Sequence, residues 1–417
     1  MSNKQAVICQ CQRENKSRGV YQGKTKRRTF LKNMEGSLLL SGIGSCRAEL
    51  LLELTQHFVG MTDSPVIFLT SRAEMLEALL YAGNVGDVQG VMASFAGHKN
   101  YHPMYGFGSQ QVCEMVRITA ETLGCTSLMD ELILYTTAIT NIVSRYYPPS
   151  LPAISQLLKS DDDYIAKIAA NSHLTNVIVD NILGSYQAGI MLRRVVEKLE
   201  ETFSEVAEPG SETKYNFQSG AKRGVPVMAF YQPCREQALM NVYLKEEIYN
   251  VLQCIPKVRI IADEILFVSR KDELLSYLLD LKRQRKIDLV ICSENANEML
   301  QRDMVEFSNV CLFPHATKTG FDDISKAMFG TYMHHYPVLS KGSPASVLFT
   351  FKKDEHWTVA TEERLKVRAE DLYGNRNWKG EYREQAVIKK YNDPNIYMVP
   401  VENIRGEENR NYGLSLH

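Results

Sequence analysis

The chain has 417 residues, of which 44% are hydrophobic and 23% are charged, and its formal net charge is −1. This length accommodates one large α/β domain with an insertion, or two domains. The near-zero charge excludes a globally basic nucleic-acid-binding protein, but it leaves room for a local basic patch.

The nine cysteines show no repeated spacing of the kind that metal sites use, so a zinc site and a disulfide framework are both disfavoured. No apolar run approaches the roughly 20 residues that a membrane-spanning helix requires. We therefore expect a cytoplasmic protein without a transmembrane segment, which reaches the membrane periphery only through partners.

The chain begins with a polar, basic segment over residues 1–33, which precedes the first half of an α/β domain over 34–104. Strands alternate with helices in this half, which predicts a mainly parallel sheet covered on both faces. The expected strands are 38–40, 65–69 and 88–94, and the expected helices are 49–59 and 74–81.

A glycine-rich turn lies between the first predicted strand and the first predicted helix. Its sequence is Ser41-Gly42-Ile43-Gly44-Ser45-Cys46-Arg47-Ala48. Strand, glycine-rich turn and helix are the context in which a P-loop binds a triphosphate on backbone N–H groups. Against the pattern G-x-x-x-x-G-K-[ST], Ser41 and Cys46 replace the two glycines. Arg47 replaces the lysine, and Ala48 the hydroxyl that holds Mg²⁺, so the turn resembles a phosphate-binding loop without its catalytic groups.

Residues 105–215 carry helical patterns and no strand signal, which predicts an all-helical insertion domain of about one hundred residues. The proline-rich break Tyr147–Pro152 divides it into two helical blocks. The expected helices cover 112–123, 128–146 and 174–203, with a short one that ends at Ala169.

The α/β pattern returns over residues 216–350 as the second half of the same domain, and residues 351–417 form a C-terminal extension. From Arg376 onward the extension is charged and turn-rich, and we expect it to be peripheral. The expected strands are 225–230, 258–262, 288–292, 310–313 and 345–349, and the expected helices are 237–253 and 274–286.

An acidic pair, Asp263-Glu264, ends the predicted strand over 258–262. P-loop ATPases place such a pair at this point, with the Asp engaging Mg²⁺ and the Glu polarising the attacking water. The alternative is that the pair only echoes the position in the fold and has no chemistry.

Four segments together resemble the conjugative coupling proteins, which are TraG/TraD-type ATPases of type IV secretion within the FtsK/HerA group of DNA motors. Their pattern runs from an acidic strand, through a basic turn into a sensor strand, to a later helix that ends in glycine. The resemblance covers roughly residues 34–350, and its segments are Arg259–Ile265, Leu281–Ile287, Asp288–Ile291 and Asp323–Gly330.

The resemblance implies a RecA-like P-loop core with an all-α insertion, and ATP and Mg²⁺ as cofactors. It gives Asp263 the metal, Glu264 the catalytic water, and Arg283 a cation for the neighbouring subunit's nucleotide in a ring. A solvated helix end explains Arg283 equally well. The implied nucleotide-binding residues are Gly42, Gly44, Ser45, Cys46, Arg47 and Ala48.

The departures from the family pattern predict impaired hydrolysis. Arginine is not an isosteric replacement for lysine, and Arg47 keeps only the option of pairing with a phosphate. The sensor position, usually glutamine in the family, is Glu294, whose charge would repel a γ-phosphate.

The sequence therefore predicts a coupling-protein-like component of conjugative DNA transfer with a degenerate nucleotide loop. Its expected partners are DNA or a relaxase-type complex, type IV secretion components, and other subunits of a homo- or hetero-oligomeric ring. Two alternatives remain open, namely a divergent but active DNA-motor ATPase and an adaptor that keeps the fold without binding nucleotide.

Overall fold

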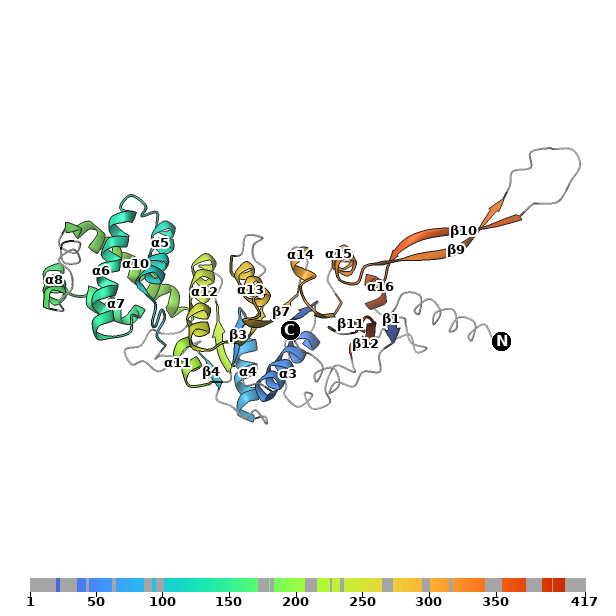
Figure 1. Cartoon of the computed structure of the whole chain (residues 1–417), viewed down its shortest axis with the longest axis horizontal. Coiled ribbons are helices and arrows are strands. Elements are labelled where there is room, and N and C mark those ends of the chain that lie inside the picture. The colour runs from blue at the N-terminus through green and yellow to red at the C-terminus, as the bar shows by residue number, and fades with distance from the viewer. Residues whose placement is uncertain are drawn as a thin grey trace, which may run out of the picture. The chain divides into compact units, whose positions relative to one another are not determined.

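The structure, a computed structural model, is that of an α/β protein with an additional helical bundle and a long β-ribbon (Figure 1). It separates into two compact units, of which the first is Met1–Arg47 with Glu294–Asn411 and the second is Ala48–Ser293 with Tyr412–His417. The described residues are 20–22, 36–42, 45–61, 65–85, 92–94, 101–171, 180, 184–206, 216–225, 227–232, 236–264, 273–294, 301–314, 318–341, 355–372, 385–391 and 393–401. The division into five segments expected from the sequence stays a prediction.

The second unit is built on a parallel sheet. The strand order is β7-β6-β3-β5-β4, and each neighbouring pair is parallel. All five residues of β3 are buried, as expected for a parallel strand covered on both faces. The mainly parallel α/β fold predicted from the sequence is thus confirmed. The strands are β3 (Val66–Thr70), β4 (Met92–Ser94), β5 (Val227–Tyr231), β6 (Val258–Asp263) and β7 (Ile287–Ser293).

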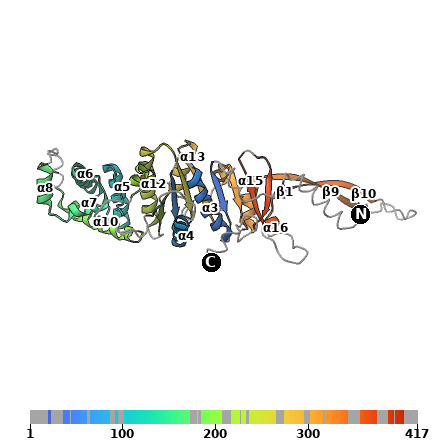
Figure 2. The same ribbon diagram turned by 90° about the horizontal axis from the view of Figure 1, so that it is seen from below.

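Helices cover both faces of this sheet (Figures 1 and 2). On one face lie α3 (Ser45–Met61) and α4 (Ala73–Val85), and on the other lie α12 (Gln237–Cys254) and α13 (Glu273–Arg283). Each buries an apolar stripe, because a sheet with two hydrophobic faces requires a layer on each side. In α3 the buried stripe consists of Leu50, Leu51, Leu54 and Phe58.

Between β4 and β5 the described residues form helices and no strand, so the predicted all-α insertion is confirmed. Local capping explains two of the boundaries. Ser150 begins α7 by accepting a hydrogen bond from the Ala153 N–H, and Asp161 accepts one from the Tyr164 N–H at the start of α8. The helices are α5 (Ser109–Thr122), α6 (Met129–Tyr146), α7 (Leu151–Leu158), α8 (Asp162–Asn171), α10 (Tyr186–Ser204) and α11 (Phe217–Lys222).

The first unit has a mixed sheet with the order β1-β12-β11-β8-β2. The pairs β2–β8 and β1–β12 are parallel, whereas β11 is antiparallel to both β8 and β12. Three short helices accompany this sheet, namely α14 (Gln301–Met304), α15 (Lys318–Phe329) and α16 (Ala369–Leu372). The strands are β1 (Val20–Gln22), β2 (Leu38–Ser41), β8 (Asn309–Leu312), β11 (Gln385–Lys389) and β12 (Ile396–Pro400).

The expectation of a peripheral C-terminal tail is wrong for β11 and β12, which are part of this sheet. Ala386, Val387 and Ile388 are buried in β11. These three apolar residues stand within a charged segment, so their strand signal is too short to recognise from composition.

A separate antiparallel ribbon is formed by β9 (Thr331–Lys341) and β10 (Glu355–Leu365) (Figure 1). The rings of Tyr332, His334 and Tyr336 follow one another along one face of β9. This spacing of two residues puts them on the same side of a strand. The predicted strand over 345–349 lies outside the described residues.

The described helices include no candidate for a membrane span, since none is both long and apolar enough.

Candidate functional site

The turn after β2 is shaped by packing against β8 within the first unit. Gly42 has a φ of +124°, and a Cβ placed on it would lie 2.7 Å from the backbone oxygen and the Cβ of Phe313. The Phe313 N–H donates to the Ser41 carbonyl over 2.8 Å. Only glycine combines this backbone conformation with so close an approach. Packing alone therefore accounts for this glycine.

The remaining residues of the predicted nucleotide loop are only partly described. Gly44 lies outside the described residues, and Ser45 and Cys46 are placed as the first backbone residues of α3. Ala48 is buried, and its methyl group offers no ligand to a metal.

Arg47, at the position of the P-loop lysine, is buried with 1% of its side chain exposed. One of its guanidinium nitrogens lies 3.4 Å from a carboxylate oxygen of Glu294, which is 247 residues away in the chain. The residue at the lysine position thus contacts the residue at the expected sensor position. The Glu294 side chain is 63% exposed, so its charge is available to repel an anion that approaches Arg47.

Asp263 ends β6 in the second unit, and its carboxylate is fully buried. Arg72 binds it in a bidentate manner, with Nε 3.0 Å from one oxygen and a terminal nitrogen 2.6 Å from the other. The Thr70 hydroxyl donates to the same carboxylate over 2.8 Å. Both oxygens of the predicted metal ligand are therefore engaged by protein donors.

The parallel register of β3 and β6 creates this arrangement. Thr70 is paired with Asp263 across the two strands, so the residues that follow β3 reach the acidic end of β6. The Ser71 hydroxyl also donates to the Glu264 carbonyl over 3.0 Å. Burial lowers the pKa of Arg72, but the neighbouring Asp263 carboxylate outweighs this effect, so the net pKa is raised and Arg72 stays charged.

Glu264 adopts a left-handed backbone conformation with a φ of +51°, which is uncommon for a residue with a side chain. Its N–H donates to the Cys292 carbonyl at the end of β7 over 3.0 Å. The strand therefore turns sharply directly after Asp263, and Glu264 lies at the carboxyl edge of the parallel sheet, where α/β proteins form their sites.

Arg283 lies at the end of α13, where its guanidinium is 2.6 Å from Asp280 on the preceding turn. Both side chains are about half exposed. This is the geometry of an i,i+3 pair at a solvated helix end, and the role toward a neighbouring subunit stays a prediction.

The described residues fit a magnesium–nucleotide site poorly. Asp263 already carries a cation in Arg72, and Ala48 lacks the hydroxyl that a P-loop provides. Among the described residues there is also no group of three or more His, Cys, Asp or Glu side chains that could hold a metal. The internal arginine supplies the positive charge that a metal would bring to this carboxylate.

The contacts of Thr70 and Arg72 with Asp263 were not predicted from the sequence. Their only sequence signal is a polar group directly after a buried strand, because the partner strand is 191 residues away from Arg72.

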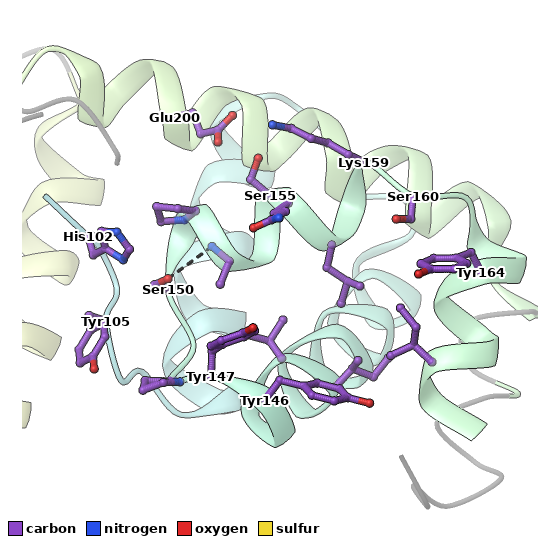
Figure 3. A pocket seen from close by; sticks show the side chains of 18 residues that line it. His102, Tyr105, Tyr146, Tyr147, Ser150, Ser155, Lys159, Ser160, Tyr164 and Glu200 are labelled. Atoms are coloured by element: carbon purple, nitrogen blue, oxygen red, sulfur yellow. Dashed lines mark hydrogen bonds between the residues drawn. The ribbon is translucent and has the colours of Figure 1, made fainter. Parts of the chain in front are cut away.

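The helical bundle contains a second candidate site, a groove with a volume of about 1140 Å³ (Figure 3). Its lining includes the tyrosines Tyr105, Tyr146, Tyr147 and Tyr164 among aliphatic and small polar residues, together with Lys159 and Glu200. Tyr147 is 70% exposed, Tyr146 54% and Tyr164 53%. Such a surface offers rings on which flat or extended ligands can pack.

The described residues thus define an α/β protein with a parallel sheet and an inserted helical bundle. No protein-family model matches the chain, and no curated protein matches it. Similar solved structures include VirB4 of Thermoanaerobacter pseudethanolicus, with a TM-score of 0.46 and 12% identity over 70% of this chain and 80% of that chain.

They also include the bacterial conjugative coupling protein TrwB in a trigonal form with sulphate, with a TM-score of 0.46 and 12% identity. That match covers 89% of this chain and 85% of the other. TrwB with the non-hydrolysable GTP analogue GDPNP has a TM-score of 0.49 and 11% identity, over 89% of this chain and 86% of that one.

Proposed function

We propose that this chain is a coupling-protein-like component of conjugative DNA transfer or type IV secretion whose nucleotide site does not hydrolyse ATP. The motifs that resemble the family and the helical bundle inserted into a parallel α/β unit support the first part. The bonding of Asp263 supports the second. In this proposal the chain is a binding subunit of the transfer apparatus, which acts alone or in a mixed ring with an active ATPase.

The observation that carries the loss of hydrolysis is the bidentate pair between Arg72 and Asp263. A guanidinium that binds both oxygens of a carboxylate forms the strongest type of side-chain hydrogen-bonded pair. A metal would have to displace this cation from a fully buried acid. Arg47 adds to the effect, because the Glu294 carboxylate partly neutralises the arginine that stands at the position of the P-loop lysine.

We expect the purified chain to release no phosphate from Mg·ATP above a protein-free background, with or without DNA. The reason is that Asp263 is bound to Arg72 and Ala48 provides no metal ligand. A steady-state phosphate-release assay measures this directly. The matched variant is Glu264→Gln, which removes the carboxylate that would polarise water and should leave the background rate unchanged.

Turnover by the wild type that disappears in Glu264→Gln would overturn the loss of hydrolysis and establish the divergent motor instead. Calorimetry then separates the remaining two cases. Heat of binding at millimolar ATP without turnover fits a nucleotide-binding but inactive subunit, and no heat fits an adaptor.

We further propose that the groove of the helical bundle contacts transferred single-stranded DNA through its exposed tyrosines. Exposed tyrosine rings are platforms on which bases stack, whatever their sequence, and each stacked base contributes about 1–3 kcal/mol. Tyr146 and Tyr147 line the groove, and more than half of each residue is exposed.

Replacing Tyr147 with alanine is expected to weaken binding of a labelled single-stranded oligonucleotide about five- to one-hundredfold, as measured by fluorescence anisotropy. Tyr391→Ala is the matched control, because Tyr391 is 62% exposed but belongs to the other unit. Wild-type affinity should also fall on the order of tenfold between about 50 and 200 mM salt, as phosphate contacts require. Equal affinities of the two tyrosine variants would remove the groove from the DNA contact, and salt-independent binding would remove the DNA role.

A further inference from the structure

A cluster of buried aromatic rings joins the helical bundle to the parallel sheet within the second unit. Tyr243 of α12 lies at its centre, in edge-to-face contact with Phe203 of α10 at 4.6 Å between ring centroids. Phe230 of β5 lies 6.0 Å from the same ring. Six rings, all fully buried, belong to the cluster, namely Tyr101, Phe107, Phe203, Phe217, Phe230 and Tyr243.

A carboxyl group, that of Glu247, is buried within this apolar cluster and has no exposed surface. Tyr243, one turn earlier on α12, donates its hydroxyl to Glu247 over 2.7 Å. The hydroxyl of Tyr101 is in direct contact with that of Tyr243. The second oxygen, Oε2, is buried and has no hydrogen-bond partner among the described residues. The acid thus connects α12 with the segment 101–107.

The segment 101–107 is in turn hydrogen-bonded to the helical bundle. The Gly106 N–H donates to the Pro149 carbonyl over 2.7 Å, and the Leu151 N–H donates to the Pro103 carbonyl over 2.9 Å. Met104 has a φ of +61°, a conformation that its surroundings must hold in place. Glu247 is therefore one of the polar groups that connect α12, through Tyr243 and Tyr101, with the segment that precedes the bundle.

Burial raises the pKa of Glu247 to about 8, against the opposing effects of the Tyr243 hydroxyl and the Met104 backbone. Burial also raises the pKa values of Tyr101 and Tyr243 well above the ordinary range, so both phenols keep their protons. Glu247 is the member of this cluster that titrates near neutral pH.

The charged neighbours on α12 have other partners. Glu246 accepts a hydrogen bond from Gln111 of α5 over 2.6 Å, and Lys245 lies over the ring of Tyr277 of α13. His102 lines the groove of the bundle (Figure 3). The elements α10, α11 and β5 present the phenylalanine rings described above.

We propose that the protonation state of Glu247 controls the stability of the junction between the helical bundle and the parallel sheet. The protonated carboxyl stabilises this junction, and ionisation of the carboxyl destabilises it. The neutral acid is compatible with the surrounding rings and needs no counter-ion. The ionised form places a charge among six aromatic rings, where the Tyr243 hydroxyl donates to one carboxylate oxygen and the other has no hydrogen-bond partner among the described residues.

The direction of the pH effect follows from linkage. The pKa of Glu247 is higher in the folded protein than the value of about 4.3 for an unfolded glutamate, so the folded state binds more protons between these two values. Its stabilising effect is complete below about pH 4 and is lost as the pH rises to about 8. Above that pH the contribution of Glu247 no longer changes.

The test compares urea unfolding of the full chain, followed by helical circular dichroism, in steps from pH 5 to pH 9. For the wild type we expect Glu247 to raise the unfolding equilibrium constant about tenfold per pH unit between pH 5 and 8. Glu247→Gln cannot ionise and should lack this pH dependence. The urea concentration at its unfolding midpoint should therefore rise relative to that of the wild type as the pH increases. Glu246→Gln, one residue away, should keep the wild-type dependence.

A second measurement does not depend on the folding of any variant. The infrared carbonyl band of a protonated carboxylic acid should be present in the wild type at pH 6 and absent at pH 9, since exposed acids are already ionised at both values. Identical infrared spectra at these two pH values would overturn the proposal. So would equal pH dependence of the wild type and Glu247→Gln.

Discussion

Replacing Arg72 with methionine is expected to lower the free energy of unfolding by about 3–5 kcal/mol, because the change removes one partner of a buried ion pair. Asp263 has no exposed surface and loses both of its Arg72 hydrogen bonds, which leaves Thr70 as its remaining side-chain donor. Methionine keeps the length and most of the volume of the arginine stem. The loss of stability therefore reflects the removal of the charge and not the removal of packing contacts. Urea unfolding followed by circular dichroism measures it.

Two further variants locate the cause. The double variant Arg72→Met/Asp263→Asn removes the uncompensated charge and should recover a large part of the lost stability. Arg117→Met is the matched control, because Arg117 also pairs with carboxylates but is 40% exposed, and such pairs contribute at most about 1 kcal/mol. If Arg72→Met and Arg117→Met destabilise the protein equally, Arg72 does not hold a buried acid.

Replacing Gly42 with alanine is expected to destabilise the first unit by about 2–5 kcal/mol, through backbone strain and through overlap with Phe313. The added Cβ would lie 2.7 Å from backbone and side-chain atoms of Phe313, at a φ that alanine rarely adopts. Chemical unfolding measures the change.

Gly330→Ala separates strain from overlap. Gly330 lies in the same unit with a φ of +76°, but a Cβ there would meet no atom within 4 Å. Its replacement should therefore show backbone strain alone, about 1–2 kcal/mol. A Gly42→Ala effect no larger than this would show that Phe313 does not approach the turn so closely.

Arg72→Met and Gly42→Ala bear on the function as well as on stability. A glycine-rich turn and an acidic strand end are the two signatures of a nucleotide site, and each has a structural explanation here. Phe313 accounts for Gly42, and Arg72 accounts for the burial of Asp263. Both features therefore contribute to the stability of the frame, in agreement with the proposed function without nucleotide turnover.

Much of the fold could be predicted because its elements have strong local signals. The apolar runs of β3 and β6 and the amphipathic pattern of α6 lie where the sequence placed them, within one or two residues. The short strand β11 could not be predicted, because three apolar residues among charged neighbours carry little information. The ribbon of β9 and β10 was missed for a related reason, since both strands mix polar, aromatic and aliphatic residues without a continuous apolar run.

The candidate site was predictable only in part. The position of Asp263 at a strand end followed from a buried run that stops at an acidic pair. Arg72 and Thr70 could not be assigned to it, because their contact depends on which strands are neighbours and on their register. The contact between Arg47 and Glu294 joins residues 247 positions apart and has the same origin.

The alternation of strands and helices, the inserted bundle and the residues of the glycine-rich turn could be identified from the sequence alone. These properties are local, because each depends on residues close together in the chain. The pair between Arg72 and Asp263 at the end of β6 and the burial of Glu247 could be identified in the three-dimensional structure but not in the sequence. Both results depend on contacts between distant segments, whose burial sets the energy of each charge.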